Sequence, residues 1–272
     1  MLERLIGRLP RKVRGFPGMK TLPWMKTLPR TETPSRTETG VRIYAIGDIH
    51  GQDGLLAELH AAIIEDAGAH PGERGRVVYL GDLIDRGPGS RQVIDRLLDA
   101  PLPGLEQVVL MGNHEESMLG FLEDDTNGPS WLAFGGIDTV ESYGVEAPSS
   151  MGKADLARVQ AQLRQAVSAR HRHFLGTLPL THHCGDYFFV HAGIRPGVPL
   201  EEQSAQDLLW IRDPFLSSGI DFGKVVVHGH TITPEPVVRP NRIGIDTGAF
   251  RSGILTCLVL SGAERYFIQT GN

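Results

Sequence analysis

The stretch "VRIYAIGDIHG" (41–51) runs from an apolar segment through a glycine into an aspartate and a histidine. Four later stretches repeat this pattern: "RVVYLGD" (76–82), "QVVLMGNH" (107–114), "YFFVHAG" (187–193) and "KVVVHGH" (224–230). Near-continuous apolarity over roughly four to six residues is typical of strands that are buried on both faces. These five stretches therefore predict the strands of an α/β fold.

Helix-like segments separate the predicted strands. Helices are predicted over 55–67, 91–98 and 153–170, and in the last of these apolar residues recur at helical spacing. Towards the end of the chain, "NRIGIDTGAF" (241–250) and "GILTCLVLSG" (253–262) predict further strands that close a sheet. This alternation of strands and helices favours an α/β domain.

The composition is that of an ordinary globular protein. The 272-residue chain is 40% hydrophobic and 22% charged, and no apolar run approaches the roughly 18 residues that cross a bilayer. The acidic net charge of −5 argues against broad nucleic-acid binding. Cys184 and Cys257 are too few for a disulfide framework. We therefore expect a cytoplasmic protein without a strong nucleic-acid or membrane signal.

Residues 1–40 differ from the rest of the chain in charge and in sequence pattern. They carry nine Lys/Arg against three Glu, so this segment is near +6 and the remainder near −11. A six-residue repeat in "MKTLPWMKTLPRTETPSRTETGVR" (19–42) is interrupted by prolines and is too short to build a core. We predict a flexible basic N-terminal arm over 1–40 and a catalytic domain over 41–272.

Polar residues follow each predicted strand by one to four positions and form the candidate site. The carboxyl ends of strands are where open α/β sheets bind ligands. Aspartate, asparagine and imidazole without cysteine suit a hard or borderline divalent ion such as Mn²⁺, Fe or Zn²⁺. The candidate ligands are too many for one ion, which predicts two ions that share a carboxylate and hydrolyse a phosphoester. The residues are Asp48, His50, Asp82, Asn113, His114, His191 and His230.

Five short motifs occur in order: "GDIHG" (47–51), "GDLIDRG" (81–87), "GNHE" (112–115), "HAG" (191–193) and "GHT" (229–231). Together they resemble the metallophosphoesterase superfamily, and within it the PPP-type serine/threonine protein phosphatases of bacteria and phages. The resemblance implies a calcineurin-like α/β fold: a central β-sandwich of mixed sheets flanked by helices. It also implies a dinuclear metal centre at one edge of the sandwich.

The resemblance implies a role for each candidate ligand. It implies two divalent metal ions, with Mn²⁺ as the expected ion and Fe or Zn²⁺ as alternatives. It also implies hydrolysis by direct attack of a water that bridges the ions. The implied ligands are Asp48, His50 and the bridging Asp82 for one ion, and Asp82, Asn113, His191 and His230 for the other.

The resemblance further implies an acid and a phosphate clamp. His114 is placed as the general acid for the leaving group, and Asp85 as the carboxylate that orients it. Asp85 could instead cap the helix that follows. Arg86 and Arg212 resemble two arginines that clamp phosphate, although a salt bridge to Asp213 or Asp207 is an alternative for Arg212.

The pair His228 and His230 in "KVVVHGHT" (224–231) poses a choice. Strand alternation alone would place both side chains on one side, as a two-histidine clamp. The resemblance separates them, because it gives His230 a ligand role and His228 none. We therefore expect His228 to be a structural neighbour of the site.

The resemblance implies that the protein is a phosphomonoesterase that acts on phosphoserine or phosphothreonine in proteins. The alternative is a symmetrical bis(5'-nucleosyl)-tetraphosphatase or another nucleotide or RNA-end pyrophosphohydrolase, with a nucleotide as substrate. Asp85 favours the protein phosphatase, because we expect a small residue there in the tetraphosphatases. An inactive phosphatase fold that serves as a binding module would lack ligands, and none is missing here.

Overall fold

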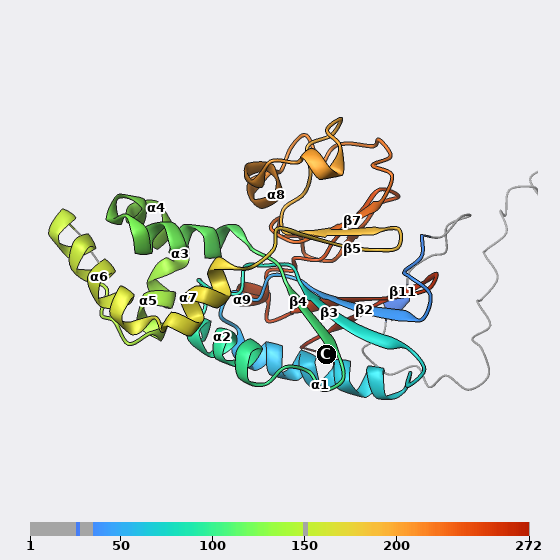
Figure 1. The fold of residues 1–272 in the computed structure, drawn as a ribbon, viewed down its shortest axis with the longest axis horizontal. Helices are drawn as coiled ribbons and strands as arrows, with labels where there is room; N and C mark the ends of the chain where they lie inside the picture. Colours follow the sequence, from blue (N-terminus) through green and yellow to red (C-terminus); the bar gives the residue numbers. More distant parts are fainter. Residues whose placement is uncertain (1–25, 28–34, 149–151, 272) are drawn as a thin grey trace, which may run out of the picture.

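The computed structural model describes residues 26–27, 35–148 and 152–271, which form two sheets packed face to face (Figure 1). The first sheet has, in spatial order, β1 (Lys26–Thr27), β11 (Glu264–Gln269), β10 (Thr256–Ser261), β2 (Val41–Ile46), β3 (Arg74–Tyr79) and β4 (Glu106–Val109). The second has β5 (Thr181–Cys184), β6 (Tyr187–Val190), β7 (Val225–His228), β9 (Arg242–Gly244) and β8 (Val237–Val238).

Both sheets are mixed, and their parallel strands position the site. In the six-stranded sheet β2, β3 and β4 run parallel, and Ile46 at the end of β2 pairs with Tyr79 at the end of β3. In the five-stranded sheet β6, β7 and β9 run parallel, while β5 and β8 pair antiparallel at the two edges. The loops that follow parallel neighbours therefore leave each sheet at a common edge.

Strand β2 shows how the layers are held together. Its side chains alternate, so that Ile43 and Ala45 pack into the core between the two sheets, whereas Tyr44 and Ile46 pack into the core under the helices. All six β2 residues are buried, which explains the continuous apolar run in the sequence. The predicted α/β fold, a sandwich of mixed sheets flanked by helices, is confirmed.

Helices cover the outer face of the six-stranded sheet and extend beyond one end of it (Figure 1). The predicted helix over 153–170 is wrong in one respect, because the first helix ends at Ala166 and Ser168 caps a second one. The helices are α1 (Asp53–Gly68), α2 (Ser90–Asp99), α3 (Asn113–Glu123), α4 (Gly128–Trp131), α5 (Ile137–Ser142), α6 (Lys153–Ala166), α7 (Ala169–Gly176), α8 (Ala205–Trp210) and α9 (Ala249–Ser252), with shorter turns η1 (Asp125–Asn127), η2 (Leu132–Gly136) and η3 (Leu200–Glu202).

The outer face of the five-stranded sheet is covered by α8 and the loops around it (Figure 1). Phe188 and Val226 on this face pack against Leu208 of α8 and against Phe215 in the following loop. This third core cluster fixes the loop that carries Arg212, which matters for the site below. Within the described ranges, no helix is long and apolar enough to cross a membrane.

Most of the predicted N-terminal arm lies outside the described residues, and its flexibility stays a prediction. Its last residues, 35–40, contact both sheets. The Arg36 N–H donates to the Asp186 carboxylate (2.8 Å), and the Thr37 N–H donates to the Gly262 carbonyl (3.2 Å). The arm is therefore attached to the body on the side of β6 and β10–β11 where these contacts lie.

Candidate metal centre

The backbone is strained at the candidate site. Five residues other than glycine have left-handed backbone angles in the described ranges, and all five were singled out as site residues in the sequence. Such angles cost energy and collect at functional sites, where neighbouring contacts hold them in place. They are His50 (φ 48°), Asp82 (48°), Asp85 (72°), Arg86 (64°) and His230 (62°).

One group of ligand atoms draws on both sheets, and we name it the two-sheet pocket: Asp82, Asn113, His191 and His230. The Asp82, His191 and His230 ligand atoms lie within 4.8 Å of one another, and all three residues are buried. His191 Nε2 lies 2.8 Å from Asn113 Oδ1 and 3.4 Å from Asp82 Oδ1. His230 Nδ1 lies 2.9 Å from the same Asn113 oxygen. The four predicted ligands of one ion thus converge on one point.

The donor and acceptor pattern of this pocket fits a cation. His191 donates its Nδ1–H to the Leu80 carbonyl (2.8 Å), so its Nε2 presents a lone pair to the Asn113 oxygen. Among the described residues, His230 Nε2 is buried without a hydrogen-bond partner. A buried lone pair without a donor is costly, and a divalent ion would satisfy it.

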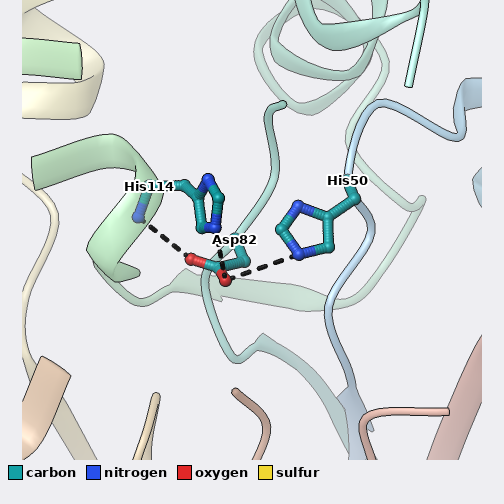
Figure 2. A group of neighbouring side chains, drawn as sticks. All are labelled: His50, Asp82 and His114. Carbon is teal, nitrogen blue, oxygen red and sulfur yellow. Dashed lines mark hydrogen bonds and ion pairs between the residues drawn. The ribbon is translucent and has the colours of Figure 1, made fainter. Parts of the chain in front are cut away.

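A second group comes from the six-stranded sheet alone, and we name it the one-sheet pocket: Asp48, His50, Asp82 and His114. Figure 2 shows His50 and His114 on either side of the Asp82 carboxylate, with Asp82 Oδ2 3.6 Å from His50 Nε2 and 3.8 Å from His114 Nε2. His50 donates its Nδ1–H to the Ile84 carbonyl (2.8 Å), which leaves the Nε2 lone pair directed into the pocket. Asp82 belongs to both pockets and stands where a bridging ligand would.

Asp48, the remaining predicted ligand, lies at the side of the one-sheet pocket. Its carboxylate accepts the backbone N–H of His230 (3.0 Å), which ties the loop after β2 to the loop after β7. Burial raises the pKa of Asp48, and the negative charges of Asp246 and Asp82 raise it further. Three carboxylates in one buried site repel each other, and cations between them relieve that repulsion.

Asp246 was missed as a site residue in the sequence. It is buried, its Oδ1 accepts the Gly248 N–H (2.9 Å), and its Oδ2 has no partner within the described part of the chain. Burial raises its pKa to about 6. The signal was available, because Asp246 follows strand β9 by two residues, as Asp48 follows β2.

The histidines are prepared to act as ligands. Burial lowers the pKa of His50 and of His230 to about 3, and burial also lowers the pKa of His191. These rings are therefore neutral at physiological pH, and a neutral imidazole offers the lone pair that a metal needs. For Asp82, burial raises the pKa, but the surrounding imidazoles outweigh burial and the pKa is lowered. The residues present thus fit two divalent ions.

His114 and Asp85 form the predicted acid pair. His114 Nδ1–H donates to Asp85 Oδ2 at 2.6 Å, and both side chains are buried. The Asp85 carboxylate also accepts hydrogen bonds from Trp131 Nε1 (2.8 Å) and Thr139 Oγ1 (2.6 Å). Burial raises the pKa of Asp85, and these hydrogen bonds oppose it. Asp85 is held from three sides and orients the imidazole, rather than capping helix α2, whose cap residue is Gly89.

Glu115, in the motif "GNHE", is a second residue to which the sequence gave no role. Its buried carboxylate accepts the backbone N–H groups of Gly112 (2.9 Å), Asp82 (2.9 Å) and Leu83 (2.8 Å). It thereby joins the loop after β3, which carries Asp82, to the start of α3, which carries His114. A side chain that fixes the loops carrying the ligands positions the ligands themselves.

The two predicted phosphate clamps differ in their surroundings. Arg86 Nη1 lies 2.9 Å from His50 Nε2, and Arg86 Nη2 lies 3.0 Å from His114 Nε2, so one guanidinium spans the one-sheet pocket. Arg212 is exposed, and after burial and the charge of His191 its positive charge also contributes to lowering the pKa of His230. The alternative partner Asp207 is occupied by Arg195, at 2.8 and 2.5 Å.

His228 lies away from the pockets. Strand β7 ends at this residue, and His230 follows with a left-handed backbone, so the two rings do not continue one alternation. The His228 ring packs edge to face on Phe215, 5.0 Å between centroids, in the core outside the five-stranded sheet. Arg242 Nη1 lies 3.3 Å from its Nε2. The structure therefore places only the second histidine of "HGH" with the other candidate ligands.

Comparisons with known proteins identify the family. The sequence pattern of the calcineurin-like phosphoesterases matches residues 41–249. An asymmetrical bis(5'-nucleosyl)-tetraphosphatase of Bacillus subtilis (strain 168) is 29% identical over 232 residues, which cover 78% of this chain and 87% of that protein. A symmetrical bis(5'-nucleosyl)-tetraphosphatase of Aromatoleum aromaticum is 31% identical over 163 residues, covering 60% of this chain and 48% of that one.

Solved structures agree on the fold. The crystal structure of a putative diadenosine tetraphosphatase superposes with a TM-score of 0.59 at 21% identity, covering 88% of this chain and 99% of the other. The two curated relatives named above are tetraphosphatases and not protein phosphatases, and they favour the alternative that the sequence left open. On the match to residues 41–249, this chain belongs to the calcineurin-like phosphoesterase family.

Proposed function

We propose that this chain hydrolyses bis(5'-nucleosyl) tetraphosphates, with two divalent cations held in the two pockets. The observation that carries the reaction type is the convergence of the two pockets on one shared carboxylate, Asp82. The substrate class is supported by relatives that match most of the chain and are named for this activity. Mn²⁺ is the ion we propose, because the ligands are oxygen and imidazole without thiolate.

The ions and the chain divide the work of hydrolysis. When bound, two such ions stabilise negative charge on phosphoryl oxygens and lower the pKa of water. The chain contributes the orientation of the substrate. Arg86 spans His50 and His114 with its two terminal nitrogens, and a guanidinium fork of this kind binds two phosphoryl oxygens at once. Arg212 adds positive charge on the side of His230, where the rest of the phosphate chain would lie.

His114 supplies a proton to the leaving oxygen from Nε2. Burial lowers its pKa, but the charge of Asp82 and the hydrogen bond to Asp85 outweigh burial, so the pKa of His114 is raised. A raised pKa favours the protonated ring, which is the form that a general acid needs. Asp85 holds Nδ1, so that Nε2 is the nitrogen that faces the pocket.

A second candidate is the hydrolysis of phosphoserine or phosphothreonine in proteins. The observation that favours it is the well-supported pair of His114 and Asp85. The alkoxide that leaves from phosphoserine is strongly basic and needs a proton. A nucleotide phosphate leaves as a weak base and depends less on protonation. We rank it second, because the relatives that match most of the chain are named for nucleotide substrates.

The test is a comparison of kcat/KM on diadenosine tetraphosphate and on a phosphoserine peptide, with Mn²⁺ in both assays. We expect a preference for the dinucleotide of at least about 10-fold, equivalent to roughly 1.4 kcal/mol in transition-state binding. The variant Asp82→Ala, purified in parallel, controls for contaminating phosphatases. The reverse preference would transfer the assignment to the protein phosphatase, and binding without turnover would indicate a binding module.

A further inference from the structure

The segment η2 (Leu132–Gly136) lies directly against the phosphate-binding arginine. It is a kinked segment between α4 and α5, in which Gly135 departs from helical backbone angles. Its Gly135 has a φ of 112°, and its carbonyl accepts the Arg86 N–H at 3.1 Å. A side chain at Gly135 would come within 2.6 Å of Arg86 Cγ. The turn and Arg86 therefore pack closely, and these contacts hold the turn beside the one-sheet pocket.

The side chains around this turn differ in burial. Trp131, just before it, is buried and donates to Asp85, and Leu132 is buried in the core under the helices. Phe134, in contrast, is 63% exposed. The exposed large hydrophobic residues in the described part of the chain are Ile64 (47%), Ile220 (49%) and Phe134, and Phe134 is the aromatic one. An exposed aromatic ring at a rigid turn is available for a ligand.

Arg86 connects Phe134 to the reacting centre. Two of its nitrogens reach His50 and His114, and the third, Nε, lies 3.4 Å from the Phe134 carbonyl. Phe250 packs on the same guanidinium, 5.1 Å from its ring centroid to the arginine carbon Cζ. The ring of Phe134 has no such partner among the described residues. Among the described residues its ring thus has no partner, and the Arg86 side chain lies between Phe134 and the expected phosphoryl group.

We propose that Phe134 is the platform on which a nucleobase of the substrate stacks. A nucleotide whose phosphoryl group is held at Arg86 extends away from the ions by one ribose before its base. Aromatic rings bind bases through their faces, with little dependence on which base is present. The proposal rests on the proposed function, since a phosphoserine side chain has no base to stack. It predicts that Phe134 contributes to recognition of nucleotides and makes no contribution to the chemical step.

The experiment compares two substrates that share a phosphate chain and differ in their bases: diadenosine tetraphosphate and inorganic tetraphosphate. Phe134→Ala is expected to lower kcat/KM for the dinucleotide by about 10-fold, chiefly through KM, as loss of one stacked base does. It should leave kcat/KM for inorganic tetraphosphate unchanged. Phe134→Trp, which keeps an aromatic face, should restore the dinucleotide value. Ile220→Ala, at another exposed apolar position (49%), is the matched control and should change neither substrate.

The outcomes separate the two proposals. Wild-type protein that fails to hydrolyse diadenosine tetraphosphate overturns the proposed function, and the platform with it. Wild-type protein that is active on it, with Phe134→Ala unchanged, overturns the platform alone. An equal loss on both substrates also overturns the platform, because it assigns Phe134 to the support of Arg86. A loss on both substrates that Phe134→Trp restores leads to the same conclusion.

Discussion

The two pockets share Asp82 but are built in different ways. The two-sheet pocket joins His191 and His230 from the five-stranded sheet to Asn113 from the six-stranded sheet, and it exists only where the two sheets pack together. The one-sheet pocket takes its side chains from the loops after β2, β3 and β4, and the half-buried Arg86 lies across it. Under the proposed function, the packing of the sandwich would hold one ion, and the local loops would arrange the substrate around the other.

This difference assigns distinct tasks to the two pockets. The two-sheet pocket is buried and its ligand atoms already lie in contact, so it favours affinity for an ion. The one-sheet pocket contains the acid pair and Arg86, so it favours contact with the reacting phosphoryl group. Substitutions can therefore be chosen to remove both pockets, one pocket, or the proton donation in one of them.

Removal of Asp82 should break both pockets at once and have the largest effect. Its carboxylate lies 3.4 Å from His191 Nε2 and 3.6 Å from His50 Nε2. We expect Asp82→Ala to lose both divalent ions and to lower kcat by about 10³-fold or more, because several kcal/mol of charge stabilisation disappear. Metal content measured by elemental analysis, together with kcat, checks this.

Asp53→Asn is the matched control, since Asp53 is half-buried, pairs with Arg96 at 2.6 Å and lies outside both pockets. This control should keep both ions and wild-type kcat. An Asp82→Ala protein that still bound two ions would show that the two pockets are held independently and share no ligand.

Removal of His230 should break the two-sheet pocket alone. His230→Ala takes away the nitrogen that lies 2.9 Å from Asn113 Oδ1 and leaves His50 in place. We expect the number of tightly bound ions to fall from two to one and kcat to fall by about 10²-fold. The reason is that loss of a residue that binds the ion costs at least as much as loss of a residue that only orients such a ligand. The stoichiometry of Mn²⁺ in titration calorimetry measures the change.

His228→Ala is the control offered by the same "HGH" sequence. Its ring packs on Phe215 outside the sandwich, so the variant should lose stability and retain both ions. A His228→Ala protein with one ion would contradict the separation of the two histidines, and so would a His230→Ala protein with two.

The sequence predicted the site better than it predicted the contacts that hold the site. Residues two to four positions after a parallel strand, such as Asp48 and Asn113, were expected to gather because such strands end at one edge of a sheet. Glu115 and Trp131 were given no such role, because their task depends on loops and helices far apart in the chain that meet only in the folded protein. Similarly, the single helix predicted over 153–170 missed the break before Ser168, where a side-chain cap outweighs apolar spacing.

The substrate is the part of the function that strand and motif patterns predicted least. The five motifs describe the ions and the phosphoryl group, which many phosphoesterases share, and so they cannot separate a phosphoprotein from a dinucleotide. Asp85 was taken to favour the protein phosphatase, whereas the relatives favour the tetraphosphatase. The contact that we propose for substrate selection lies at Phe134, whose carbonyl accepts from Arg86 in a kinked segment that no repeated pattern reveals.

Substitution of Asp85 should act within the one-sheet pocket without removing an ion, and its effect should be the smallest. Asp85→Asn keeps the shape of the side chain and one acceptor oxygen for His114 and Trp131, but it removes the oxygen that accepts from Thr139 and the charge that faces His114. We expect kcat for a phosphoserine peptide, whose alkoxide needs a proton, to fall by about 10-fold, as for other outer partners. For p-nitrophenyl phosphate, whose leaving group is a weak base, kcat should change little. His114→Ala is the reference, and it should lower kcat more for the phosphoserine peptide than for p-nitrophenyl phosphate while retaining both ions. If Asp85→Asn lowered kcat equally for the two substrates, Asp85 would support the pocket and would not orient the acid.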